Sequence, residues 1–180
     1  MGNGLLLNLE AHVAPLIDFL RAHPEYVLPV VFLFAFGECV AFVSLLVPAT
    51  VFFSLFGAFA GAAGLDLKPI AITAAIGAGC GFWISYWIGE KLGPEAAHHW
   101  PFTRHPDMLP RGHAFFEKWG WAGIFLGHFF GPVRAVVALV AGICTMPQLP
   151  FQLANWAAST IWGFGLVYGA GFIGQRAGLL

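Results

Sequence analysis

Three long segments of this 180-residue chain contain no Asp, Glu, Lys, Arg or His: residues 39–65, 69–89 and 135–175. About 20 consecutive apolar residues are enough for one helix to cross the hydrocarbon core of a bilayer. Charged residues make up only 9% of the chain and hydrophobic residues 59%, which is too little charge to cover the surface of a soluble domain. We therefore expect a single all-α integral membrane domain over residues 1–180.

The remaining composition argues against several other classes of protein. A formal net charge of −1 gives no indication of a nucleic-acid partner. The cysteines are widely separated and lie in apolar segments, so we interpret them as small apolar side chains, and the histidines of the central segment lack the spacing of a metal site. No motif of a hydrolase, nucleotide-binding protein or metalloprotease is present, so we expect no enzyme activity, metal or cofactor. The cysteines are Cys39, Cys80 and Cys144, and the histidines of the central segment are His98, His99, His105 and His113.

The apolar segments divide the chain into six parts. Residues 1–25 lack the basic start of a secretory signal and are predicted to form an amphipathic helix along the membrane interface. The first and third apolar segments are too long for one span each and contain Gly and Pro, which break helices. We therefore predict two re-entrant helical hairpins (26–65 and 119–146), two transmembrane helices (69–90 and 150–174) and a polar loop between them (91–118).

The two halves of the chain carry matching features at a nearly constant offset. Pro48 and Thr50 correspond to Pro132 and Arg134 at an offset of 84 residues, and Tyr86 and Tyr168 are 82 apart. Two broken apolar segments at corresponding positions are typical of a transporter built as a pseudo-inverted repeat, with the two hairpins facing each other. Chance similarity between glycine-rich segments, and prolines that only kink continuous helices, are the alternatives.

Small residues recur every four positions along two of the predicted helices. This spacing allows helix backbones to approach closely in a membrane. Packing within the chain is the favoured interpretation, and a contact in a homodimer is the alternative. The residues are Gly77, Gly81, Ser85, Gly89 and Gly93 in one series, and Gly123, Gly127 and Gly131 in the other.

Three polar side chains lie next to or within the apolar segments: Glu38, His128 and Arg134. An ionised group in the bilayer centre costs about 3 kcal/mol on insertion scales, so such groups face a protein interior and indicate a functional site. We expect Glu38 and Arg134 to meet if the hairpins face each other. Arg134 would bind a phosphate, helped by His128 and by the helix start after Gly131 and Pro132, and Glu38 would take up a proton, with His128 as a second titratable group.

A static ion pair that only holds helices together is the structural alternative. An ion or proton antiporter and a non-transporting membrane scaffold are the alternative functions. One acidic residue alone is weak support for an antiporter, and a scaffold would have no reason to bury a charged pair.

The chain resembles the DedA family of bacterial membrane proteins, which shares its domain with eukaryotic SNARE-associated and VTT-domain proteins. The residues that carry the resemblance are ECVAFVSLLVPATVFFSLFGAFAG, GAGCGFWISYWIGEKLG, FFEKWGWAGIFLGHFFGPVRAVVALVAGICTMP and FQLANWAASTIW. The resemblance implies facing re-entrant hairpins in a multi-pass protein of the bacterial inner membrane. It also implies a flippase or transporter for an anionic lipid carrier, with undecaprenyl phosphate as the first candidate and a phospholipid as the second, linked to the proton-motive force.

The polar residues of the family pattern are only partly present. Glu38 matches the acidic residue early in the first hairpin, and Arg134 matches the second of two hairpin arginines. His128 stands in place of the first arginine. Ala49 and Thr50 stand where the pattern has an acid after the first hairpin proline, and Phe82 replaces an acid before the Ser-Tyr motif. Thr50 is retained as a predicted substrate contact.

Overall fold

The computed structural model of the chain describes residues 22–40, 49–62, 66–93, 95, 103–104, 107–130 and 133–177. The regular structure in these parts is all helical, with one short 3-10 helix, η1 (Pro24–Tyr26), and six α-helices. The helices are α2 (Val27–Cys39), α3 (Ala49–Ala62), α4 (Leu67–Leu92), α5 (Met108–Gly127), α6 (Val133–Ile143) and α7 (Gln148–Ala177). The predicted amphipathic helix over residues 1–25 lies almost entirely outside the described residues.

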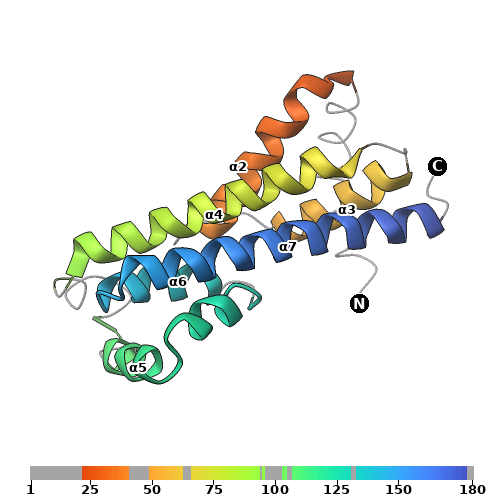
Figure 1. The fold of residues 1–180 in the computed structure, drawn as a ribbon. Helices are drawn as coiled ribbons and strands as arrows, with labels where there is room; N and C mark the ends of the chain where they lie inside the picture. Colours follow the sequence, from red (N-terminus) through yellow and green to blue (C-terminus); the bar gives the residue numbers. More distant parts are fainter. Residues whose placement is uncertain are drawn as a thin grey trace.

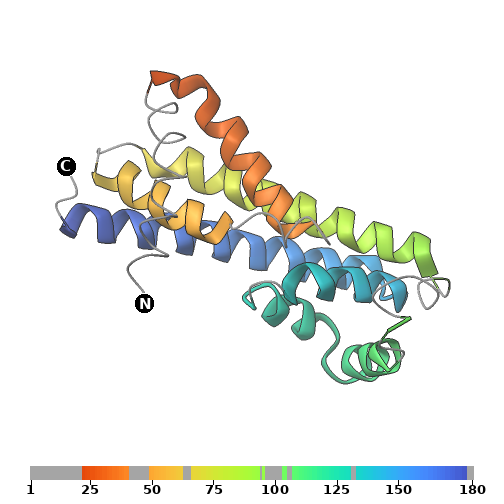
Figure 2. The same ribbon diagram turned by 180° about the vertical axis from the view of Figure 1, so that it is seen from behind.

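Two long helices, α4 and α7, form the centre of the molecule and run side by side in opposite directions (Figures 1 and 2). Within them, Leu67–Leu92 and Gln148–Ile173 are each long and apolar enough to cross a membrane. At about 1.5 Å of rise per residue, α4 with its 26 residues is about 39 Å long, more than the roughly 30 Å of a bilayer core. The structure thus has helices where transmembrane segments were predicted over residues 69–90 and 150–174.

The four shorter helices pack against the central pair in a regular pattern. Helix α2 packs on α4 and α3 on α7, whereas α5 packs on α7 and α6 on α4. Helices α2, α3 and α6 have only 13, 14 and 11 residues. At about 1.5 Å per residue, each spans roughly half to two thirds of a bilayer core.

Helix α4 begins and ends at residues suited to those positions. The Asp66 side chain accepts a hydrogen bond from the backbone N–H of Lys68 at 2.9 Å, which satisfies a donor that the helix leaves free. Gly93 ends the helix with φ at +47°, a left-handed conformation that only glycine adopts at little cost.

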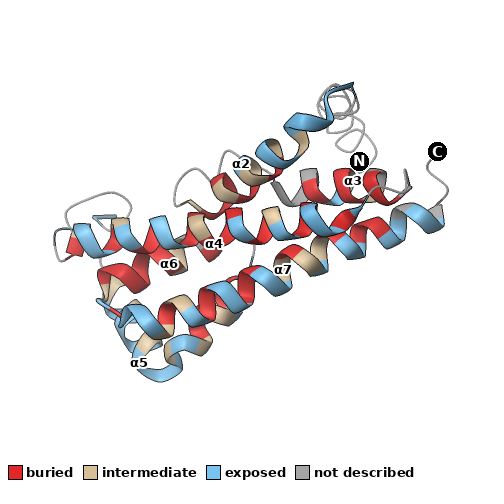
Figure 3. Ribbon diagram, turned by 45° about the horizontal axis from the view of Figure 1, so that its top comes forward, coloured by how far each residue is buried: buried red, intermediate tan, exposed pale blue. Residues whose placement is uncertain are grey.

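Small residues bring the helices into close contact, and much of α4 and α6 is buried (Figure 3). A Cβ atom at Gly77 or Gly81 would collide with the backbone of α2, and one at Gly89 with the carbonyl oxygen of Leu139 in α6. Ser85, the third residue of this series, donates a hydrogen bond from its hydroxyl to the Cys39 carbonyl oxygen of α2 at 2.8 Å. The prediction that this series packs within the chain is therefore confirmed for these four positions.

The second series of small residues behaves less uniformly. The Gly127 Cα faces the Val137 side chain of α6, but the Gly123 Cα faces the Phe115 ring of its own helix. Gly131 lies outside the described residues. Whether either series also forms a contact between two copies of the chain stays a prediction.

Helix α5 differs from the predicted organisation. It begins at Met108, inside the segment predicted as a polar loop over residues 91–118. The helix bends at Gly120, where φ is +49°, so that residues 108–119 and 121–127 form two separate helical pieces. The first piece carries polar residues but packs Leu109 and Phe116 against α6, which explains why a polar sequence is helical here.

The apolar core lies around α4 and includes side chains of all five other helices, α2, α3, α5, α6 and α7. It contains Cys39, which is buried, whereas Cys80 and Cys144 are half-buried. All three cysteines are free thiols. Burial of Cys39 agrees with its interpretation as a small apolar side chain.

Candidate functional site

Four helices place their ends or midpoints at one polar site in the centre of the molecule. Glu38 is the next-to-last residue of α2, and Arg134 is the second residue of α6. His128 directly follows the end of α5. Trp162 lies at the middle of the 30 residues of α7, so the site sits halfway along the longest helix.

Glu38 and Arg134 form a buried ion pair. Arg134 Nη2 lies 2.6 Å from Glu38 Oε2, and the two side chains are 2% and 10% exposed. The contact was predicted from the sequence and is confirmed. Arg134 Nε and Nη2 have no hydrogen-bond partner among the described residues. Coulombic attraction between the two opposite charges holds the pair.

Trp162 supports the other side of the guanidinium. Arg134 Cζ lies 4.7 Å from the centroid of the Trp162 ring, the geometry of a cation–π contact. Such a contact stabilises a desolvated cation by about 2 kcal/mol. Arg134 is thus fixed between a carboxylate and an aromatic face, with its position set by three different helices.

His128 lies in an aromatic cage beside this pair. Its ring is 4.7 Å from the ring of Phe82 and 6.3 Å from that of Trp162, measured between centroids. The residue is fully buried, and neither ring nitrogen has a hydrogen-bond partner within the described part of the chain. A buried imidazole without a partner is unusual, because burying an unpaired polar group costs about 1–3 kcal/mol.

The helix dipoles disfavour both charges of the pair. A carboxylate is disfavoured at a helix C-terminus, where Glu38 lies, and a cation is disfavoured at a helix N-terminus, where Arg134 lies. The guanidinium and the N-terminus of α6 together form a concentration of positive charge, and Glu38 is the anion that neutralises it here. Neither charge is therefore stabilised by the dipole of the helix that carries it.

The other predicted site residues are less well defined. Thr50 is the second residue of α3, but the structure does not describe the position of its side chain. Gly131 and Pro132 lie outside the described residues. The predicted break at Pro48 also lies outside them. The structure therefore brings together Glu38, His128 and Arg134 and leaves the rest of the predicted site without an observed position.

Sequence reasoning missed Trp162 and a buried polar series next to it. Asn155 donates to the Gly79 carbonyl oxygen at 3.0 Å, and the Ser159 hydroxyl lies 3.3 Å from Asn155 Oδ1. Tryptophan in a membrane helix prefers the interface, so one in the middle of an apolar span was a signal that could have been used. Polar residues within the same span gave a second signal.

Within the described residues, no group of three or more His, Cys, Asp or Glu side chains has the arrangement of a metal site. His113 of the central segment is exposed on α5, while His98, His99 and His105 lie outside the described residues.

Comparison with known proteins identifies the family of the chain. The family model for the VTT domain matches residues 47–171, which include α3 to α6 and most of α7. The chain belongs to the VTT-domain family. Its bacterial members include the DedA proteins, so the resemblance noted in the sequence is confirmed.

Among its relatives, the inner membrane protein YabI of Escherichia coli K12 is 31% identical over 150 residues, covering 83% of this chain and 59% of YabI. An uncharacterized membrane protein, BU139, of Buchnera aphidicola is 29% identical and covers 82% of this chain and 57% of its own length. The inner membrane protein YqjA of E. coli K12 is 29% identical over 57% of this chain and 46% of YqjA. The chain spans less than three fifths of the length of these relatives. No solved structure matches it.

The family and the structure together establish the setting of the site. The protein is a multi-pass protein of the bacterial inner membrane, since its relatives are inner membrane proteins and two of its helices can cross a bilayer. The buried charged pair and the buried histidine beside it thus lie within the membrane domain.

Proposed function

We propose that this protein is a transporter that moves an anionic lipid, with its phosphate bound at Arg134, across the inner membrane. Undecaprenyl phosphate is the first candidate substrate and a phospholipid the second. The single observation that carries the proposal is the buried pair of Glu38 and Arg134 at 2.6 Å, halfway along the membrane domain.

The packing pattern supports a pseudo-inverted repeat with two re-entrant hairpins. If α2, α3 and α4 correspond to α5, α6 and α7, the contact of α2 with α4 corresponds to that of α5 with α7. The contact of α3 with α7 then corresponds to that of α6 with α4. Helices too short to cross the bilayer are expected in re-entrant hairpins, and substrate sites of such transporters lie near the midplane, between the repeats. The tyrosines used to align the halves differ in environment, since Tyr86 is buried and Tyr168 exposed.

Arg134 is suited to bind the phosphate. A guanidinium offers several N–H donors in a planar fork that fits phosphate oxygens, and two of its nitrogens have no hydrogen-bond partner in the described part of the chain. A helix leaves its first N–H groups without intrahelical partners, so the start of α6 can contribute donors to an anion. His128, Thr50, Gly131 and Pro132 are the proposed neighbours of the phosphate in this site.

Glu38 would act as a competitor of the substrate for the same guanidinium. In the arrangement described, the carboxylate occupies the place of an anion beside Arg134. A proton on Glu38 removes its negative charge and frees Arg134 for the phosphate. When the phosphate leaves, the carboxylate loses its proton and pairs with Arg134 again. Uptake of the lipid would in this way be linked to uptake of a proton.

Translocation in liposomes tests this proposal. Purified protein is reconstituted with labelled undecaprenyl phosphate, and its exposure on the outer leaflet is followed with and without a pH gradient for wild type, Glu38→Gln and Arg134→Ala. We expect transport by the wild type that depends on the gradient, none by Arg134→Ala, and gradient-independent behaviour of Glu38→Gln. Folded wild-type protein that moves neither this lipid nor a labelled phospholipid would rule out the proposal and favour an antiporter or a scaffold.

A further inference from the structure

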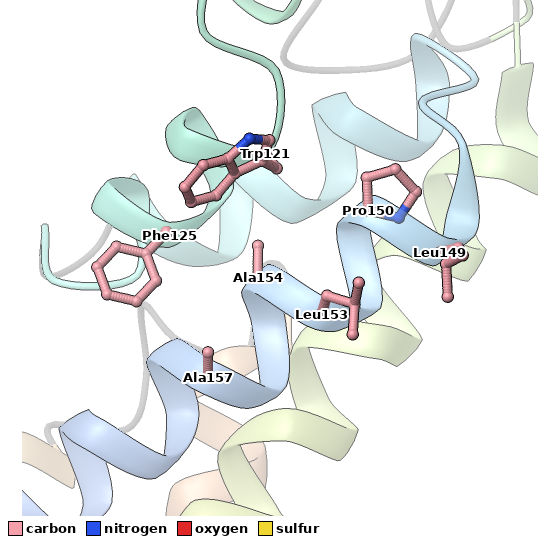
Figure 4. A pocket seen from close by; sticks show the side chains of 7 residues that line it. All are labelled: Trp121, Phe125, Leu149, Pro150, Leu153, Ala154 and Ala157. Atoms are coloured by element: carbon pink, nitrogen blue, oxygen red, sulfur yellow. The ribbon is translucent and has the colours of Figure 1, made fainter.

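A groove with apolar walls lies between the second piece of α5 and the first half of α7 (Figure 4). Trp121 and Phe125 form the α5 wall, and the α7 side chains Leu149, Leu153 and Ala157 form the other. Its volume is about 420 Å³, within the usual range of roughly 300–1,000 Å³ for small-molecule sites.

Small residues create the hollow. Ala154 and Ala157 follow Leu153 along the α7 wall, and their short side chains leave the space into which the aromatic rings of α5 face. The rim is open, because Trp121, Leu149 and Leu153 are each more than 60% exposed. In a membrane domain, side chains exposed in this way contact hydrocarbon, so the groove is accessible to a lipid chain from the side.

Both walls of the groove lead to the ion pair. On α5, the Phe125 ring lies 5.6 Å from that of Phe129, which lies 6.1 Å from the ring of His128. On α7, Trp162 follows Ala157 by five residues, or about 7.5 Å along the helix axis. The two walls meet where the rings of His128 and Trp162 are 6.3 Å apart, and Arg134 stacks on that same Trp162.

The groove has the length and chemistry of a site for part of a hydrocarbon chain. From Leu149 to Ala157 it covers eight residue steps of α7, about 12 Å, or somewhat under half of a bilayer core. Its lining residues carry no charge, and the one charged centre to which its walls lead is the ion pair. A molecule with one anionic end and a long apolar chain fits this arrangement.

We propose that the groove between α5 and α7 binds the hydrocarbon chain of the lipid whose phosphate is held by Arg134. This inference rests on the proposed function and adds to it a binding site for the chain. The part of the lipid nearest the phosphate passes His128 and Phe129, and the following carbons lie against Phe125, Ala157 and Leu153. Selection of long-chain lipids over free phosphate then comes from this groove, whereas selection for the anion comes from Arg134.

A second hollow lies on the other side of α5, lined among others by Leu126, Phe130 and Val137. Its second wall is formed by the short helix α6. Unlike the wall formed by α7, this wall does not continue along a membrane-spanning helix to Trp162. We therefore assign the chain to the α5–α7 groove, and the α5–α6 hollow becomes an outcome of the test.

Filling the groove tests the inference. Ala157 is exposed and lines the groove, so Ala157→Trp places an indole in it without disturbing the core. The matched control is Ala114→Trp, the same substitution at an exposed alanine of α5 that does not line the groove. The probes are undecaprenyl phosphate with a photoreactive diazirine in the first third of its chain, counted from the phosphate, and methyl phosphate, which presents the phosphate alone.

Displacing about two methylene groups from an apolar site weakens binding roughly tenfold, so we expect Ala157→Trp to bind undecaprenyl phosphate at least about tenfold more weakly. Methyl phosphate should bind equally to wild type, Ala157→Trp and Ala114→Trp, and photolabel in the wild type should map to α5 and α7 peptides that contain Trp121 or Leu153.

Equal binding of the long-chain lipid by wild type and Ala157→Trp, or label confined to the α5–α6 hollow, would overturn the chain site while leaving the proposed function intact. Wild-type protein that binds neither probe would overturn both.

Discussion

The buried pair of Glu38 and Arg134 allows a quantitative prediction. With Nη2 and Oε2 2.6 Å apart, Coulomb's law at an effective dielectric near 20 gives an attraction of about 6 kcal/mol. Removing both charges from water costs several kcal/mol per ion, so the intact pair contributes little net stability. Removing one partner is different, because the other charge then stays buried without compensation.

We therefore predict a strongly non-additive double-mutant cycle. Glu38→Met and Arg134→Met should each lower the free energy of unfolding by about 3–5 kcal/mol. The double variant contains no uncompensated charge, and methionine is flexible enough to fill either space, so it should lie within about 1 kcal/mol of wild type. For a chain of this size, a loss of 3 kcal/mol corresponds to a fall in Tm of about 6–12 °C.

Thermal unfolding in detergent micelles measures the four proteins side by side. Adding methyl phosphate distinguishes an anion site from a structural ion pair, because an anion can replace the missing carboxylate. At a hundred times its Kd, such a ligand stabilises the folded state by about 2.7 kcal/mol. We expect this gain in Glu38→Met and none in the double variant. Two single variants that each cost less than about 1 kcal/mol and add without coupling would refute the reasoning.

Three further predictions follow from individual contacts. Trp162→Leu removes the aromatic face beside Arg134 and should weaken methyl phosphate binding in a titration of the purified protein, whereas Trp162→Phe, which keeps an aromatic face, should retain most of it. A Cβ atom at Gly142 would collide with the Tyr86 carbonyl oxygen of α4, so Gly142→Ala should lower the Tm, while Gly165→Ala, with nothing within 4 Å, should be neutral or raise stability by up to about 1 kcal/mol. Tyr86→Phe removes a buried hydrogen bond of 2.6 Å to the Met146 carbonyl oxygen and should cost about 1 kcal/mol in chemical unfolding; an unchanged midpoint would contradict the bond.

The sequence was most informative where the membrane imposes strict rules. Charge is so costly in a bilayer that uncharged segments predicted the long helices α4 and α7, and the few buried charges predicted the contact of Glu38 with Arg134. Glycines at spacings of four likewise indicated where α4 meets its neighbours, because only a residue without Cβ allows such an approach.

Other features could not be predicted from these rules. The first piece of α5 is polar on one side and so resembles a loop in a search for apolar segments, although Phe116 and Leu109 anchor it to α6. The role of Trp162 depends on Arg134, which is 28 positions away in the sequence and meets it only in the folded chain. The helix ends that surround Glu38 and Arg134 depend on tertiary packing, which no local pattern encodes.

Binding of lipid phosphate to variants of the ion pair tests the central claim most directly. The affinity of the full chain in nanodiscs for undecaprenyl phosphate would be measured for wild type, Glu38→Gln and Arg134→Gln. Because the account makes Glu38 a competitor for Arg134, it predicts tighter binding by Glu38→Gln than by wild type, and loss of binding by Arg134→Gln. Equal affinities in all three proteins, or binding that is lost in Glu38→Gln and kept in Arg134→Gln, would contradict it.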